Sequence, residues 1–242
     1  DEAGILAQIR ALVAMLPGNN EEEGCYSDCA DDLNRVCAEL QGVEYSASYI
    51  LSTIADGKAF FETKAAYAKD MVIGFIRLNG RTVGAVANGE QEMTARGAQK
   101  AAEFVEFCDA FNIPVLTITN VKGFKASLCT ERNIGKAAAK LTYAFANATV
   151  PKVNVIAGEA FGSAYVIMNS KGIGADLVYA WKDAKIGMMD ASLAAKVMYA
   201  DADAATQQEK AAEYAALQDS VDAAAARGYV DTVIEAQDTR KY

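Results

Sequence analysis

The chain has 242 residues, of which 52% are hydrophobic and 23% charged, and its formal net charge is −9. This composition is typical of a globular protein and excludes a disordered or collagen-like chain. Charged residues or glycines interrupt every apolar run before the roughly 18 residues that a membrane helix needs, so we expect no transmembrane segment. The acidic balance argues against nucleic acid, whose phosphates require a cationic surface.

The absence of histidine restricts the chemistry further. Without an imidazole the chain forms no Ser-His-Asp or Cys-His triad, no His-ligated zinc site and no histidine base. We therefore expect any catalysis to use backbone amides, carboxylates, lysines, tyrosines, a cofactor or a partner.

Five cysteines and no signal-like leader predict a reducing, cytoplasmic environment. Cys25, Cys29 and Cys37 cluster, but their spacing lacks the paired gaps of zinc modules. We interpret them as free thiols near a surface loop rather than as metal ligands. The seven acidic residues between positions 19 and 40 allow the same two interpretations, and a solvated acidic face is the simpler one. We expect no metal site.

The first third of the chain contains one helical pattern and one clear hairpin. Apolar spacings of four, three and four predict a helix over residues 2–16, with one face formed by Ile5, Ile9, Leu12 and Leu16. A helix and turn are expected between Ala47 and Tyr67. Asn79-Gly80 separates two β-rich runs and predicts a hairpin with strands at 71–78 and 81–87.

The rest of the chain alternates strand-like and helical patterns, separated by a polar linker at 88–93 and loops at 121–124 and 158–162. The predicted strands are 113–120, 152–157, 177–180, 186–188 and 230–234. Helical faces are formed by Ala101, Phe104, Cys108 and Phe111, by Ile134, Ala138, Leu141 and Phe145, by the short segment 163–169, and by the Ala-rich stretch 191–227 that ends at Gly228. This alternation predicts an α/β fold with a mainly parallel sheet.

The segment Phe161-Gly162-Ser163-Ala164-Tyr165 lies between a predicted strand and a predicted helix start. Free N–H groups at such a turn suit an anion or an enolate-like oxygen. The alternative is a glycine that only permits tight packing. The segment is not a nucleophile elbow, because it lacks the Gly-x-Ser-x-Gly pattern and no histidine activates Ser163.

From about Ile9 to Arg240 the chain resembles the C-terminal half of the carboxyltransferase component of biotin-dependent acyl-CoA carboxylases and of the related decarboxylase subunits. The order of the matching segments along nearly the whole chain makes the resemblance specific. These segments are Phe60-Phe61-Glu62, Tyr67-Ala68-Lys69, Val72-Ile73-Gly74-Phe75, 78–84, 107–114, 143–153, Tyr179-Ala180-Trp181 and Arg227-Gly228-Tyr229-Val230-Asp231.

The resemblance implies a single carboxyltransferase domain of the C-terminal type over residues 1–242, with a crotonase-like fold of repeated ββα units. It also implies transfer of a carboxyl group between carboxybiotin and an acyl-CoA. In this family backbone amides stabilise the developing anions, which agrees with the missing histidines. Biotin carried on a partner domain is the implied cofactor, and a coenzyme A thioester is the implied substrate.

The resemblance also implies site residues. The family's Gly-Gly-Ala-Tyr segment, whose amides hold the biotin carbonyl oxygen, corresponds to Gly162, Ser163, Ala164 and Tyr165. The first three are the expected catalytic residues, and the expected substrate-binding residues are Tyr165, Lys122, Gly123 and Phe124. Serine at 163 keeps its N–H as a donor provided that its φ is negative, because a left-handed serine is strained by roughly 1–2 kcal/mol.

The chain departs from the family at Lys122, at Ala126-Ser127, and at Asp190 and Leu193, along the cleft where biotin and the acyl chain meet. These departures fit an altered substrate, or a catalytically silent assembly subunit, which is the second interpretation. A third, a stand-alone crotonase-type hydratase or isomerase, needs a carboxylate pair and a complete CoA site in one chain.

The family's N-terminal half, which supplies the hole for the acyl-CoA enolate, has no counterpart in this sequence. The implied partners are therefore an N-terminal-half subunit or domain and a biotin carboxyl carrier domain, in a hexamer-type oligomer. The sequence leaves the acyl group and the direction of transfer open.

Overall fold

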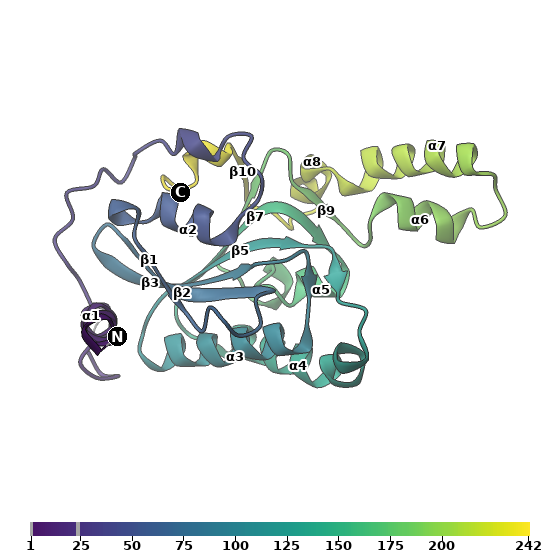
Figure 1. Ribbon diagram of the computed structural model, residues 1–242. Coiled ribbons are helices and arrows are strands. Elements are labelled where there is room, and N and C mark those ends of the chain that lie inside the picture. Colours follow the sequence, from purple (N-terminus) through teal and green to yellow (C-terminus); the bar gives the residue numbers. More distant parts are fainter. Residues whose placement is uncertain (1, 23–24) are drawn as a thin grey trace.

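Helices cover both faces of one large sheet in this computed structural model, which describes residues 2–22 and 25–242 (Figure 1). The sheet runs in the order β1 (Phe60–Thr63), β2 (Met71–Leu78), β3 (Arg81–Asn88), β5 (Val115–Val121), β7 (Lys152–Phe161), β8 (Leu177–Trp181) and β10 (Thr232–Ile234), with β9 (Lys185–Gly187) also paired to β7.

Only the pairs β1–β2 and β2–β3 are antiparallel, and the other pairs of this sheet are parallel. This confirms the predicted α/β class with a mostly parallel sheet.

The helices form two layers. α3 (Ala95–Ala110) and α4 (Leu128–Asn147) pack together on one face of the sheet, and α2 (Ala47–Ile54) lies on the other (Figure 1). The remaining helices are α1 (Glu2–Val13), α5 (Gly162–Val166), α6 (Ala191–Met198), α7 (Ala204–Tyr214) and α8 (Val221–Ala226). Each face of the sheet has its own cluster of buried apolar side chains. Among residues 2–22 and 25–242, no helix has the length and apolarity needed to cross a bilayer.

The predicted hairpin is confirmed in register, with Leu78 opposite Arg81. Asn79 and Gly80 both have positive φ, 51° and 77°, as a two-residue type I′ turn requires. The next helix along the chain is α3, whose N-cap Thr94 accepts the Gly97 N–H at 3.0 Å. Strand, strand and helix thus form one ββα unit of the expected kind.

Several boundaries differ from the expectation because long-range pairing decides them. Phe60-Phe61 opens β1 rather than ending a helix and turn. The expected polar linker and the loop at 121–124 contain β4 (Glu92–Met93) and β6 (Gly123–Phe124), which pair with each other in a second small sheet. β7 extends through the expected loop at 158–162 as far as Phe161, because β5 and β9 supply partners for it there.

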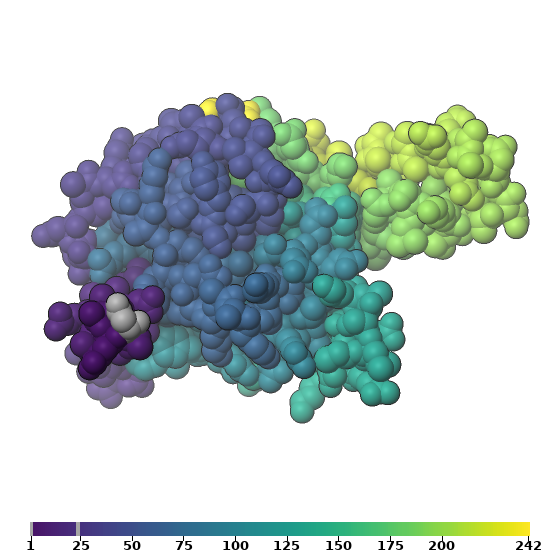
Figure 2. All heavy atoms as spheres, in the orientation of Figure 1, coloured from purple at the N-terminus to yellow at the C-terminus, as the bar shows by residue number. Residues whose placement is uncertain are grey.

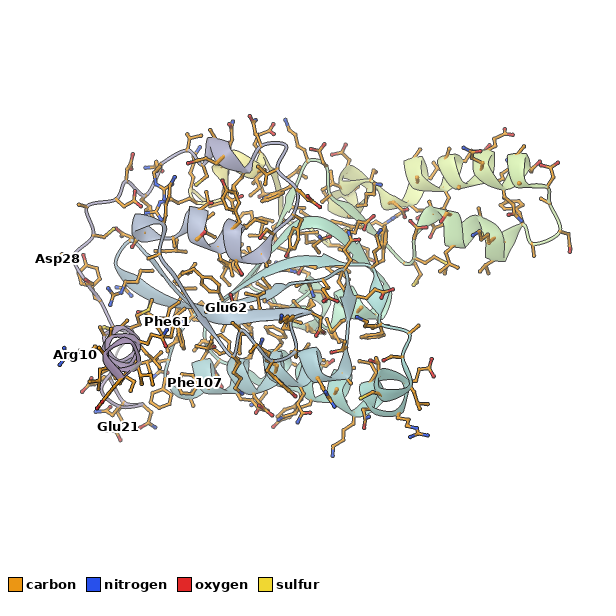
Figure 3. All side chains as sticks on the ribbon, in the orientation of Figure 1. Arg10, Glu21, Asp28, Phe61, Glu62 and Phe107 are labelled. Carbon is orange, nitrogen blue, oxygen red and sulfur yellow. The ribbon has the colours of Figure 1, made fainter. Side chains whose placement is uncertain are left out.

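The N-terminal helix is shorter than predicted and lies at the edge of the domain. Leu12 and Leu16 pack against the core, but Ile5 and Ile9 are exposed, so the expected stripe is only half covered. Phe61 and Phe107, labelled in Figure 3 on the side of the domain that carries this helix, pack against the same core.

Cys37 corrects the interpretation of three thiols near a surface loop. It is fully buried in the cluster beneath α2, whereas Cys25 and Cys29 are half-buried. Burial raises the pKa of the Cys37 thiol. The described residues contain no group of three or more cysteine or carboxylate side chains arranged to hold a metal ion.

The Ala-rich C-terminal stretch is a protruding helical arm rather than one continuous helix (Figures 1 and 2). α6 and α7 pack against each other, and Asp203 caps α7 by accepting the Thr206 N–H at 2.7 Å. A π-helical turn, Ala215–Asp219, and α8 return the chain to the sheet. As predicted, the last helix ends at Gly228, whose φ is +78°.

Two glycines with positive φ test how the hairpin is held. A Cβ on Gly80 would lie 2.1 Å from the Ser27 carbonyl oxygen, whereas one on Gly57, whose φ is +58°, would meet no atom within 4 Å. We expect Gly57→Ala to lower the free energy of unfolding by about 1–2 kcal/mol through backbone strain alone. Gly80→Ala should lower it by clearly more, in urea unfolding followed by circular dichroism. Equal losses would contradict the contact with Ser27.

Candidate functional site

The candidate site lies where β7 ends and α5 begins. Gly162 takes a φ of +61°, and a Cβ there would come within 3.0 Å of the Met188 carbonyl oxygen, so this turn requires glycine. Ser163 follows it in the first turn of α5 and is not among the non-glycine residues with positive φ. Ser163 therefore avoids the left-handed strain described above, and its N–H remains available as a donor.

The backbone N–H groups of this turn lack the usual capping partners. The first N–H groups of a helix have no acceptor within the helix. The N-cap residue Phe161 provides no side-chain cap. Among the described residues, Gly162, Ser163 and Ala164 donate none of the backbone hydrogen bonds of turns, loops and caps.

The turn borders a cavity of about 610 Å³. Gly162 and Ser163 line it beside Gly187, the last residue of β9, and Met188, which follows that strand. The C-terminal helices close it with Tyr214, Gln218, Arg227 and Tyr229. Gly162 and Ser163 therefore border a space large enough for a small organic group, between the sheet and the root of the helical arm.

Tyr165 lines the same cavity, although it is mostly buried. Burial, and secondarily the nearby Tyr229, raises the pKa of its hydroxyl to about 12, so the phenol is neutral near pH 7. Ala164 as a whole is 1% exposed and is not among the residues that line the cavity.

The cations at the cavity already have protein partners. The Arg227 guanidinium donates to the Gln218 side-chain oxygen at 2.6 Å, and Lys171 Nζ lies 2.8 Å from an Asp231 carboxylate oxygen. Each charge is thus held by an acceptor beside the cavity.

Lys122, Gly123 and Phe124 lie beside α5 but do not line this cavity. Gly123 and Phe124 form β6, which packs against α5, and Phe124 is partly buried against the core. Lys122 Nζ lies 3.1 Å from a Glu159 carboxylate oxygen. A Cβ on Gly123 would meet no atom within 4 Å. Of the expected site residues, all of 162–165 except Ala164 therefore line the cavity, whereas the expected substrate-binding residues 122–124 lie outside it.

A buried asparagine relay fixes the ends of the central strands. Asn88 Oδ1 accepts the Asn120 N–H at 3.0 Å, and Asn120 Oδ1 accepts the Glu159 N–H at 2.9 Å. A Cβ on Gly158 would lie 2.6 Å from that second oxygen, so the relay needs a glycine at this position. The relay ties the end of β5 to the segment of β7 that leads into the Gly162 turn.

Of the two departures near the arm, Asp190 has a local structural role. Asp190 is the N-cap of α6, and its carboxylate accepts hydrogen bonds from the backbone N–H groups of Ser192 and Leu193. Hydrogen bonding from the Ser192 side chain, followed by these backbone contacts, lowers the Asp190 pKa despite partial burial, and the Lys122 charge adds to the shift. Leu193 is half exposed on the arm.

Sequence reasoning missed one residue at this site, Asp219. It ends the π-helical turn, it is 3% exposed, and its Oδ1 has no hydrogen-bond partner. Burial, then the charge of Asp190, raises the pKa of this carboxyl to about 6, against an opposing contribution from Lys185. No motif marks the residue, because only the return of the arm to β9 buries it.

The family comparison covers the whole chain, since the model of the carboxyl transferase domain matches residues 1–242. The methylmalonyl-CoA carboxyltransferase 12S subunit of Propionibacterium freudenreichii subsp. shermanii is 38% identical over 258 residues, covering 100% of this chain and 49% of the relative. The methylmalonyl-CoA decarboxylase subunit alpha of Propionigenium modestum is 37% identical over 259 residues, covering 100% of this chain and 50% of that protein.

Solved structures agree. The transcarboxylase 12S hexamer with methylmalonyl-coenzyme A and methylmalonic acid bound superposes with a TM-score of 0.92 at 37% identity, over 97% of this chain and 48% of the other. The beta subunit of Pseudomonas aeruginosa geranyl-CoA carboxylase gives 0.77 at 26% identity, over 95% of this chain and 51% of the other.

The chain thus spans about half the length of these relatives and shares their crotonase-like carboxyltransferase fold. It belongs to the carboxyl transferase domain family.

Proposed function

We propose that this chain is the biotin-side part of an acyl-CoA carboxyltransferase, which moves a carboxyl group between carboxybiotin and an acyl-CoA. The observation that carries the proposal is the Gly162 turn, whose amides lack capping partners at the wall of a cavity of about 610 Å³. Membership of the carboxyl transferase family supports it.

The residues present fit a ureido group. Its carbonyl oxygen needs N–H donors, and its ring needs a space with apolar walls, which Met188 and Val166 offer beside the turn. Biotin, when bound, supplies the carboxyl group and the nitrogen that carries it. The chain would contribute the Gly162, Ser163 and Ala164 amides, which stabilise negative charge on the ureido oxygen. Loss of one donor of this kind typically costs about 10²–10³ in rate.

In this proposal Tyr165 helps to bind the biotin ring, because it lines the cavity next to the amides. Lys122, Gly123 and Phe124 would contact the acyl-CoA side, outside the cavity and beside α5. The Lys122 ammonium, paired with Glu159, is the charged group on that side.

The proposal includes partners and context. We propose that residues 1–242 form one domain of the C-terminal carboxyltransferase type, which works with an N-terminal-half domain or subunit and a biotin carboxyl carrier domain. Relatives named as carboxyltransferase and decarboxylase are similarly close, so either direction of transfer fits. By analogy with the transcarboxylase 12S hexamer we propose an oligomer. The cytoplasm remains the proposed compartment, on the sequence argument alone.

The second candidate is a catalytically silent assembly subunit, motivated by the departures at Lys122, Ser163, Asp190 and Leu193. Two of these have local roles that leave the turn intact: Asp190 caps α6, and Ser163 keeps its amide at the cavity. These observations favour the active candidate.

Reconstitution tests the activity itself. The chain mixed with a cognate N-terminal half should transfer carboxyl from radiolabelled methylmalonyl-CoA to free biotin, because the two halves together supply both oxyanion holes. Either half alone should show no transfer. A folded complex, verified by light scattering, that transfers nothing would instead favour the silent subunit.

Substitution at Ser163 tests the amide. Ser163→Pro removes the N–H at a helix-start position that proline tolerates, and we expect at least about a hundredfold weaker biotin binding in calorimetry. Ser163→Ala keeps the N–H and should bind biotin within about twofold of wild type. Melting temperatures establish that both variants fold. Wild-type binding by the folded proline variant would refute the amide role.

A further inference from the structure

Asp219 lies directly behind one wall of the cavity. Its Oδ1 is 2.5 Å from the place that a Cβ on Gly187 would occupy, and Gly187 lines the cavity together with the Gly162 turn. Gly187 is also paired with Phe161, the residue before that turn, in the β7–β9 register. The Asp219 carboxylate thus packs against Gly187, a residue of the cavity wall, and no side chain lies between them.

Few protein groups stabilise a negative charge on Asp219. Its Oδ1 is buried without a hydrogen-bond donor. The charged and titratable groups that act on it are Asp190 at the start of α6, Lys185 on β9 and Tyr214 at the end of α7. Asp190 repels a negative charge at Asp219 and Lys185 attracts one. A buried carboxylate with so few partners favours its neutral form.

We propose that a charge on Asp219 opposes the binding of an anion at the Gly162 turn, so that an anionic cyclic ureide enters this cavity together with a proton on Asp219. The ligand class rests on the proposed function. The inference adds a residue that tunes the site by charge from behind the wall, without touching the ligand.

The physical basis is the repulsion of two negative charges on either side of one strand edge. Because Asp219 is buried, solvent screens its charge weakly, and such a pair of charges is expected to change affinity by about five- to tenfold. The pKa of about 6 places the change between mildly acidic and neutral pH. Anion binding should weaken as pH rises through this value, and binding of a neutral ureide should not change.

The binding experiment compares two ureides of different charge. Violurate, a cyclic ureide that is predominantly ionised in this range, and biotin methyl ester, which is neutral, are titrated into the full chain from mildly acidic pH, just below the pKa of Asp219, to about pH 8. Wild type should bind violurate about five- to tenfold more weakly at the upper end. Asp219→Asn, a near-isosteric change, should bind violurate with the tighter affinity at every pH.

Carbon-13 NMR of labelled aspartate carboxyls gives a readout that a purely structural role would not move. The midpoint of Asp219 should fall in Asp190→Asn, which keeps a capping side chain, and rise in Lys185→Met, because these changes remove the repelling and the attracting charge respectively. Bound violurate should raise the midpoint further.

Melting temperatures check that Asp219→Asn folds, and the pKa of Asp219 predicts the direction in which they change with pH. The folded pKa lies above the ordinary value of 3.8, so the stability that Asp219 contributes is complete below that value and is lost as pH rises through about 6. Asp219→Asn should therefore melt at a higher temperature than wild type at about pH 8, and the difference should shrink at about pH 4.

The outcomes are distinct. Violurate binding that falls with pH in wild type and stays level in Asp219→Asn supports the inference. The same fall in both proteins, or an Asp219 midpoint that ignores Asp190 and Lys185, overturns it and leaves the proposed function intact. Failure of both ureides to bind wild type at any pH overturns the proposed function together with this inference.

Discussion

The left-handed turn at Gly162 is the constraint on which the site depends. Its φ of +61° and the Met188 carbonyl oxygen 3.0 Å from a Cβ position leave room for glycine alone. This reversal ends β7 and begins α5 within one residue, and it leaves the following amides without capping partners beside the cavity. A chain without histidine can stabilise an anion there with its backbone, which needs no titrating group.

The rest of the fold holds this turn in place. β5 and β7 are the central parallel strands, and the relay from Asn88 through Asn120 to the Glu159 amide fixes their ends. β9 pairs with the last residues of β7, and the arm returns behind it through the π-helical turn that buries Asp219. The site is thus assembled from the strand ends of the sheet and the root of the arm, so changes in either can alter its electrostatics.

Local patterns predicted the parts of the fold that local interactions determine. The Asn79-Gly80 hairpin, the buried face of α3 with Ala101 and Phe104, and the end of the last helix at Gly228 all follow from turn chemistry and helical periodicity. The turn at 162–164 was found for the same reason, aided by the family resemblance. β1, the β4–β6 pair and the extension of β7 depend on partners distant in sequence, and no periodicity marks them. Asp219 is the extreme case, because its burial exists only after the arm folds back.

Backbone N–H groups aimed at a ureido oxygen are the central claim, and amide NMR measures them directly. In a proton–nitrogen correlation spectrum of the labelled chain, added biotin should shift the Gly162, Ser163 and Ala164 amide protons downfield, as new hydrogen bonds to a carbonyl oxygen do. The amides of Gly123 and Phe124, outside the cavity, should move far less. Saturating biotin that leaves the three turn amides unshifted would contradict the account.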